Sequence, residues 1–290
     1  MTVQFGILLA LLCALLSNLA ILYKHRGACA APDVCWTHPF RSAIALYKSK
    51  WFAIGMAVAT FAWVLHVAAL AFAPLSLVQA VISGGLVFLT VLAERVFGFK
   101  VGARQWVGVG LMALGLVLLV AILPQTTGAH SHYSQAGMIA FEAGLLLIGT
   151  LLVLSPSLGT PHEHHGVLLG LASGLLFGVS DVAIKALTGL TGSQGIVGLA
   201  SPWLVTCIAA SVLAFFASAR GLQKGEAVPV ITMTSAGANV SCIAGGIIVF
   251  GDPMPSDTLG IVLQSFAFLL VIVAATLTPA PVRAASAQAA

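Results

Sequence analysis

The chain has 290 residues, of which 60% are hydrophobic and only 7% are charged. A soluble domain carries about 25% charged residues, so the 12 basic and 8 acidic residues of this chain are too few to cover a water-facing surface. The net charge of +4 comes without a basic run interleaved with aromatic residues, which argues against a nucleic-acid partner. Composition therefore indicates a protein embedded in a lipid bilayer.

Nine apolar segments are long enough to cross the hydrocarbon core, which takes about 20 residues of helix. In chain order we expect them at about 4–23, 51–73, 75–97, 105–123, 136–154, 166–187, 197–218, 228–250 and 257–278. Their continuous apolar runs lack the alternating polarity of transmembrane β-strands. The sequence therefore predicts an all-α, polytopic membrane protein with about nine transmembrane helices.

The basic residues predict the orientation, because Lys and Arg stay preferentially on the cytoplasmic side of a membrane. With the N-terminus outside, 11 of the 12 basic residues lie on the inner side, and only Lys185 falls on the outer side. An even number of helices would place the C-terminal half the wrong way round. We therefore predict an N-out, C-in protein of the plasma (cytoplasmic) membrane.

An internal repeat divides the chain. The first segment ends SNLAILYKHRG from Ser17, the sixth ends SDVAIKALTG from Ser180, and a Val-Phe-Gly corner follows both the third segment, at Val96, and the eighth, at Val249. Repeat partners are five helices apart and so cross in opposite directions, as in secondary transporters with inverted repeats. We predict a single transmembrane domain over residues 1–278, with a first repeat at about 1–123, a linking helix at 136–154, a second repeat at about 166–278 and a disordered tail at 279–290.

Three stretches, Ala71–Glu94, Phe97–Gly115 and Ser173–Gly189, resemble the drug/metabolite transporter superfamily, whose commonest members are called EamA-type. That resemblance implies two inverted halves, each with a Gly-Glu corner before its last helix; here Phe99 and Asp252 replace the two corner glutamates. The nine-helix count, the unpaired fifth helix and the GLQKGEAVPV segment before the eighth helix resemble more closely the NIPA-type magnesium transporter branch.

Four ionisable residues stand inside predicted helices, where a charge is costly and so demands either a partner or a function: His66, Glu142, Asp181 and Lys185. A rise of about 1.5 Å per residue places the first three at a similar level in the outer half of the bilayer. Lys185 follows Asp181 by four residues and shares its helix face. Two interpretations are open: the pair neutralises itself with Lys185 extending to the headgroups, or Asp181 belongs to a proton or cation relay.

The predicted substrate or ion path combines these residues with uncharged polar groups at depth. It consists of Ser17, Asn18, His66, Gln79, Glu142, Ser180, Asp181, Lys185, Asn239 and Gln264. Such groups also commonly join helices by hydrogen bonds, so packing is the alternative. The spacing of Gly170, Gly174 and Gly178 indicates close helix approach.

A second, weaker group of candidate ligands lies in the predicted inner loop Thr160–Gly166. His162, Glu163, His164 and His165 are ligand types that bind divalent metals, but a short solvated loop gives them no fixed geometry.

No catalytic motif and no P-loop is present, so we expect neither an enzyme nor an ATP-driven pump, and no cofactor. The leading hypothesis is a membrane transporter of small solutes that exports a metabolite or cationic compound by coupling to an ion gradient. A NIPA-like Mg²⁺ transporter is the alternative, and a non-transporting scaffold or complex subunit is a further one. The expected partners are the bilayer and a small-molecule or cation substrate; the sequence leaves a homodimer open.

Overall fold

The computed structural model describes residues 2–29, 47–85, 87, 102–122, 130–155, 161, 164–224 and 227–277. Within these ranges every regular element is helical, which confirms the predicted all-α class, and nine α-helices lie at the nine predicted segments. They are α1 (Thr2–Cys29), α3 (Lys50–Phe72), α4 (Leu75–Gly84), α6 (Ala103–Ile122), α7 (Gln135–Val153), α8 (His165–Gln194), α9 (Pro202–Lys224), α10 (Ala227–Phe250) and α11 (Thr258–Leu277). The Val96 corner and the tail at 279–290 lie outside the described residues.

Five of the described helices have the length and hydropathy of membrane spans. Five stretches of the described chain are long and apolar enough to cross a bilayer: Val3–Ala20, Lys50–Phe72, Gln135–Val153, His165–Leu199 and Thr232–Phe250. Large apolar side chains point outward from the bundle, with Val117, Phe215 and Ile248 exposed at 64%, 65% and 70%. Extended apolar surfaces of this kind are unfavourable in water, and they support an integral membrane protein.

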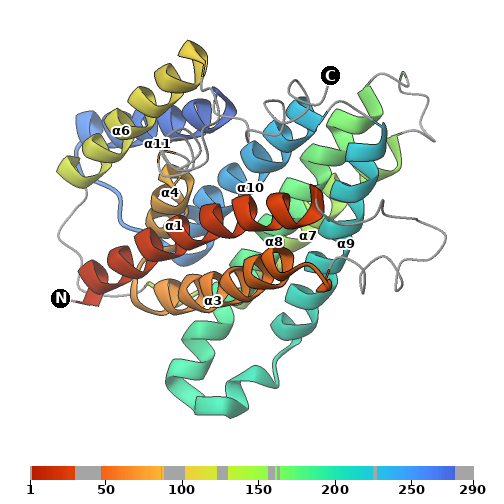
Figure 1. Ribbon diagram of the computed structural model, residues 1–290. Coiled ribbons are helices and arrows are strands. Elements are labelled where there is room, and N and C mark those ends of the chain that lie inside the picture. Colours follow the sequence, from red (N-terminus) through yellow and green to blue (C-terminus); the bar gives the residue numbers. More distant parts are fainter. Residues whose placement is uncertain are drawn as a thin grey trace.

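The helices pack in pairs (Figure 1). α1 lies along α3, and α8 lies along both α9 and α10. α6 packs against α11 at one edge of the bundle, while α4 contacts α1 and α10. α7 packs mainly on α8.

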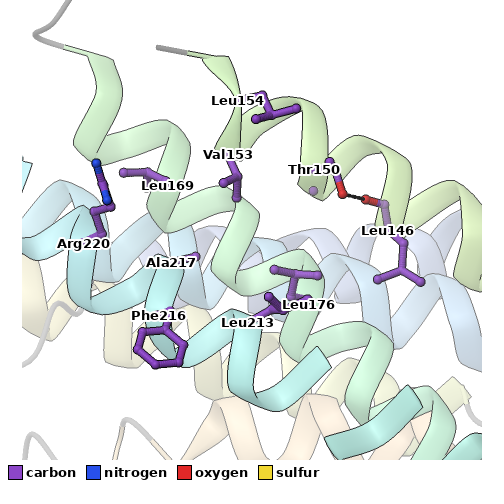
Figure 2. A pocket seen from close by; sticks show the side chains of 11 residues that line it. Leu146, Thr150, Val153, Leu154, Leu169, Leu176, Leu213, Phe216, Ala217 and Arg220 are labelled. Atoms are coloured by element: carbon purple, nitrogen blue, oxygen red, sulfur yellow. Dashed lines mark hydrogen bonds between the residues drawn. The ribbon is translucent and has the colours of Figure 1, made fainter. Parts of the chain in front are cut away.

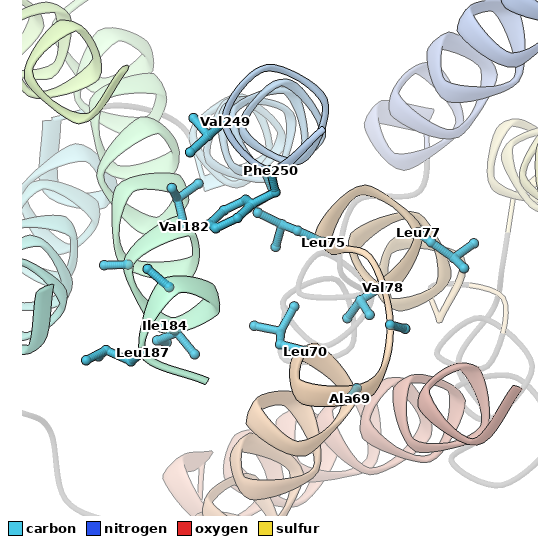
Figure 3. Close-up of a cluster of buried hydrophobic side chains, with 14 of the residues drawn as sticks. Ala69, Leu70, Leu75, Leu77, Val78, Val182, Ile184, Leu187, Val249 and Phe250 are labelled. Atoms are coloured by element: carbon cyan, nitrogen blue, oxygen red, sulfur yellow. The ribbon is translucent and has the colours of Figure 1, made fainter. Parts of the chain in front are cut away.

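Apolar side chains from α3, α4, α8 and α10 meet in the largest buried cluster (Figure 3). Its labelled members include Leu70 of α3, Leu75 and Val78 of α4, Val182 of α8 and Phe250 of α10. Burial of such a side chain stabilises a fold in water by about 1.5–3 kcal/mol, but in lipid the gain comes from close packing instead. The cluster fixes the helices whose polar side chains are described below.

Glycines bring α8 and α10 into close contact. A Cβ atom on Gly170 would lie 2.6 Å from the carbonyl oxygen of Val230, and Gly174 and Gly178 approach Thr234 and Ser241 in the same way. The close helix approach expected from this spacing is confirmed.

Four predicted boundaries of α1, α8 and α9 differ from the structure by five residues or more. α1 ends at Cys29 and not at residue 23, and α9 ends at Lys224 and not at residue 218. The sixth segment was expected to end at residue 187, but α8 continues to Gln194 and reaches 30 residues, or about 45 Å against a hydrocarbon core of about 30 Å. The seventh was expected to begin at residue 197, but the 3₁₀ helix Gly195–Leu199 intervenes and α9 begins at Pro202. Gly195, with φ of 64°, ends α8 in a conformation that suits glycine, and proline favours the first helical position.

Candidate functional site

A side-chain network joins four helices around His66 and Asp181. His66 Nε2 of α3 lies 3.3 Å from Asp181 Oδ1 of α8. The Cys242 thiol of α10 donates to Asp181 Oδ2 at 3.4 Å, and Cys13 of α1 lies within electrostatic range of His66. Cys13 Sγ is in turn 3.7 Å from Ser17 Oγ. The structure thus brings two of the predicted path residues, His66 and Asp181, into contact and places a third, Ser17, in the same region.

Glu142 of α7 is buried in the same region. Its side chain is 3% exposed, and neither carboxylate oxygen has a hydrogen-bond partner among the described residues. Both Glu142 and Asp181 lie within electrostatic range of the Cys207 and Cys242 thiols. An unpaired buried carboxylate costs several kcal/mol, so Glu142 must carry a proton or meet a cation. By contrast, the His66 and Asp181 side chains keep exposures of 12% and 22%.

Lys185 binds backbone carbonyls of α3 and does not extend to the headgroups. It is completely buried, so its predicted extension to the headgroups is wrong. Its ammonium donates to the carbonyl oxygens of Leu70 at 2.6 Å and Ala73 at 2.7 Å, at the end of α3. Leu70 would ordinarily bond to the amide of residue 74, but that residue is Pro74, which has no N–H. Lys185 supplies the missing donor.

Asp252 accepts a hydrogen bond from the backbone at the start of α4, whereas Lys185 donates to the backbone at the end of α3. It is 3% exposed, and its Oδ2 accepts a hydrogen bond of 2.7 Å from the backbone N–H of Ser76, in the first turn of that helix. Asp252 and Lys185 also interact electrostatically. A cation at the end of α3 and an anion at the start of α4 match the helix dipoles. We call Lys185 and Asp252 the corner clamp, because together they hold the turn at Pro74.

Asp252 was missed as a buried group because a loop aspartate ordinarily faces solvent. The signal that pointed to it was the Val-Phe-Gly corner. Gly251 has a φ of 62°, and the Asp252 N–H bonds back to the Gly246 carbonyl at 2.9 Å. That turn directs the carboxylate into the bundle.

Polar side chains also join α4 to α10. Gln79 Nε2 donates to Asn239 Oδ1 at 2.8 Å, and Ser83 Oγ donates to the same oxygen at 2.6 Å. Asn239 Nδ2 has no partner within the described part of the chain. Two predicted path residues, Gln79 and Asn239, are therefore in direct contact.

Three further path residues connect neighbouring segments. Asn18 Nδ2 donates to the Gly85 carbonyl at the end of α4, at 2.8 Å. Ser180 Oγ lies 2.7 Å from Ser211 Oγ of α9, and Gln264 Nε2 donates to the Pro253 carbonyl at 3.0 Å. These contacts agree with the packing alternative.

The weak metal candidates at the start of α8 divide into two groups. His162 and Glu163 lie outside the described residues. His164 is exposed, whereas His165 is buried, at 2% exposure. In the described ranges no group of three or more His, Cys, Asp or Glu side chains is arranged to hold a metal ion.

A polar cavity of about 520 Å³ lies beside the end of α8. Its lining includes Ser131, His132, Gln135 and Thr188. Thr188 follows Asp181 by seven residues, or about 10 Å of helix rise. The cavity therefore lies about two turns beyond the His66–Asp181 contact; we call it the outer cavity, because the predicted N-out orientation would place this end of α8 outside.

The chain is similar to two known proteins over nearly its whole length. A protein of Arabidopsis thaliana named as a probable magnesium transporter, NIPA9, is 24% identical over 285 residues, which cover 90% of this chain and 78% of the relative. An uncharacterised protein of Corynebacterium glutamicum is 26% identical over 278 residues, which cover 92% of this chain and 93% of the relative. No family model and no solved structure matches the chain. The similarity to NIPA9 and the apolar helices together support a membrane transporter.

Proposed function

We propose that the chain transports a small divalent cation, Mg²⁺ in the first instance, and that the cation passes Asp181 and Glu142, which we call the carboxylate site. The observation that carries the proposal is Glu142, a buried carboxylate with no hydrogen-bond partner in the described residues, in the same region as Asp181. Mg²⁺ binds through one or two carboxylates and keeps several of its waters. The similarity to a probable magnesium transporter favours this ion over other cations.

The pairing of the helices supports two inverted halves around that site. α1 packs on α3 as α8 packs on α9, and α1 contacts α4 as α8 contacts α10. Across the halves, α4 packs on α10 and α6 packs on α11. These pairings are those expected if helices 1 to 4 and 6 to 9 are related by an axis in the membrane plane.

The His66–Asp181 contact offers a way to couple binding to a change of shape. His66 belongs to the first half and Asp181 to the second. The imidazole contacts Asp181 Oδ1, an oxygen that a cation would need as a ligand. A cation arriving from the outer cavity replaces His66 at Asp181 and removes this side-chain link between α3 and α8, while the bonds of Lys185 to the end of α3 remain. The driving force is then the cation's own gradient and the membrane potential, worth about 2.3 kcal/mol per charge per 100 mV.

Flux measurements in proteoliposomes test the proposal. We expect Mg²⁺ entry, read by an internal Mg²⁺-sensitive dye, to fall at least tenfold in Asp181→Asn and in Glu142→Gln. Asp257→Asn is the matched control, because Asp257 is an exposed acid that caps α11 through the Gly260 N–H and Asn also caps helices. Wild-type protein that moves no Mg²⁺, or neutralised variants that move it at the wild-type rate, would show that the proposal is wrong.

Proton-coupled export of a metabolite or cationic compound is the second candidate. The Glu142 carboxylate, which has no partner in the part of the chain that the structure describes, also favours it, because burial in an apolar site is what a proton-carrying carboxylate requires. The same vesicles decide between the two: amine efflux driven by a pH gradient and lost in Glu142→Gln, without Mg²⁺ flux, identifies the exporter. If neither solute moves and the variants change only thermal stability, the chain is a scaffold or complex subunit.

A further inference from the structure

An apolar groove of about 270 Å³ opens between α7 and α9, with α8 behind it (Figure 2). Leu169 and Leu176 of α8 are buried, at 2% and 3% exposure, and form its floor. Leu213 and Phe216 of α9 form one wall and are exposed at 53% and 65%. The groove is therefore open to the surrounding lipid on the side away from α8.

One end of this groove is positively charged. Among the described residues that line the groove, Arg220 is the one with a charged side chain. Lys224 follows one turn later on α9, and both residues are exposed. Arg220 lies four residues from the end of α9, or about 6 Å of helix rise. The guanidinium is thus at the level of the lipid headgroups, whichever way the chain is oriented.

We propose that this groove binds a phospholipid with an anionic headgroup, with one acyl chain along the leucines and the phosphate on Arg220. From Leu213 to Arg220 the groove follows seven residues of α9, or about 10 Å, which suits a stretch of acyl chain. Arginine binds phosphate oxygens through two parallel N–H donors. The apolar wall and its terminal cation therefore match the two parts of one lipid molecule.

A second copy of the chain fits this groove less well. Packing of another apolar helix here would bury Arg220 in the contact. The described exposed residues of α7 and α9 include no acid that a symmetric partner would offer to it. A buried, unpaired cation is strongly unfavourable, whereas a lipid phosphate supplies the missing charge.

Native mass spectrometry of the purified full-length protein tests the inference, with phosphatidylglycerol and phosphatidylcholine as probes. Arg220→Gln removes the cation, and Thr150→Trp fills the groove from α7. Thr150 is exposed, and its hydroxyl donates to the Leu146 carbonyl of its own helix. Arg104→Gln is the matched control, because Arg104 is exposed at the start of α6, away from the lining.

We expect wild-type protein to retain phosphatidylglycerol in preference to phosphatidylcholine. Arg220→Gln should weaken phosphatidylglycerol about fivefold, the effect of losing one basic residue at a membrane surface, and Thr150→Trp should reduce retention of both lipids. Arg104→Gln should leave both unchanged, and all variants should keep the wild-type melting temperature. Equal retention of the two lipids, no effect of Arg220→Gln or of Thr150→Trp, or a dimer cross-linked through the groove would overturn the inference.

Discussion

Replacing Lys185 with Met tests whether the corner clamp stabilises the turn between α3 and α4. The substitution keeps the apolar stem but removes the ammonium from the Leu70 and Ala73 carbonyls. Hydrogen bonds from a charged donor contribute about 1.5–3 kcal/mol each, and breaking a buried charge arrangement costs about 3–5 kcal/mol. We expect the free energy of unfolding to fall by about 3–5 kcal/mol, because Pro74 leaves the Leu70 carbonyl without a helical donor.

Reversible unfolding in mixed micelles, followed by tryptophan fluorescence, measures this loss. Lys224→Met is the control, because Lys224 is exposed at the end of α9 and surface substitutions change stability by about 0.5 kcal/mol or less. Asp252→Asn completes a double-mutant cycle, since the amide oxygen still accepts from Ser76 while the charge is lost. Because Lys185 and Asp252 interact electrostatically, the cycle should give a coupling of about 0.5–3 kcal/mol.

A Lys185→Met protein within about 0.5 kcal/mol of wild type would refute the reasoning, because it would mean that the carbonyls find other partners. If Mg²⁺ flux were lost at that unchanged stability, Lys185 would belong to the transport path and not to the clamp.

Three further predictions concern helix contacts and pH. Gly178→Leu should cost about 1–3 kcal/mol or more in thermal unfolding, because its side chain meets Ser241, whereas Gly192→Leu, with no atom within 4 Å, should cost far less; equal losses would contradict the α8–α10 spacing. Asn239→Leu removes the acceptor of both Gln79 and Ser83 and should cost about 1–3 kcal/mol in the same assay, at about 0.6–1.7 per bond; unchanged stability would count against the network. Mg²⁺ flux should fall as the pH falls, because a protonated His66 binds Asp181 more tightly and a protonated Glu142 no longer attracts the cation; His66→Gln should weaken that dependence and leave the part due to Glu142, and a pH profile identical to that of the wild type would exclude His66 as a competitor.

Hydropathy predicted the positions of the helices well because a helix that crosses a bilayer needs a long apolar run. It failed most at the end of α8, where six of the seven residues 188–194 are small or polar. The hydroxyls of Thr188, Thr191 and Ser193 bond to carbonyls three or four residues earlier. Those bonds satisfy the polar side chains within the helix itself, so the helix continues after the apolar run has ended.

The depth of a residue could be predicted from the sequence, but its partner could not. Helix rise placed His66 and Asp181 at one level, and the two side chains are in contact. Rotation of each helix about its axis depends on packing, such as the close approach at Gly178, which hydropathy does not report. The partners of Lys185 depend on one backbone group left without a donor by Pro74, and which side chain reaches it is decided only in the folded bundle.

The path residues fall into two groups according to their hydrogen-bond partners, because some of those partners can be exchanged more readily than others. Lys185, Asn18 and Gln264 bind backbone carbonyls. Releasing these groups would leave buried carbonyls unsatisfied, at about 1–3 kcal/mol each. His66 and Asp181, and likewise Gln79 and Asn239, bind other side chains, which can rotate toward a cation or its waters without disturbing a helix end. Glu142 has no described partner to lose. If the chain transports an ion as proposed, the second group is therefore where that ion would exchange ligands at low cost, and the first is the frame that would hold the helices meanwhile.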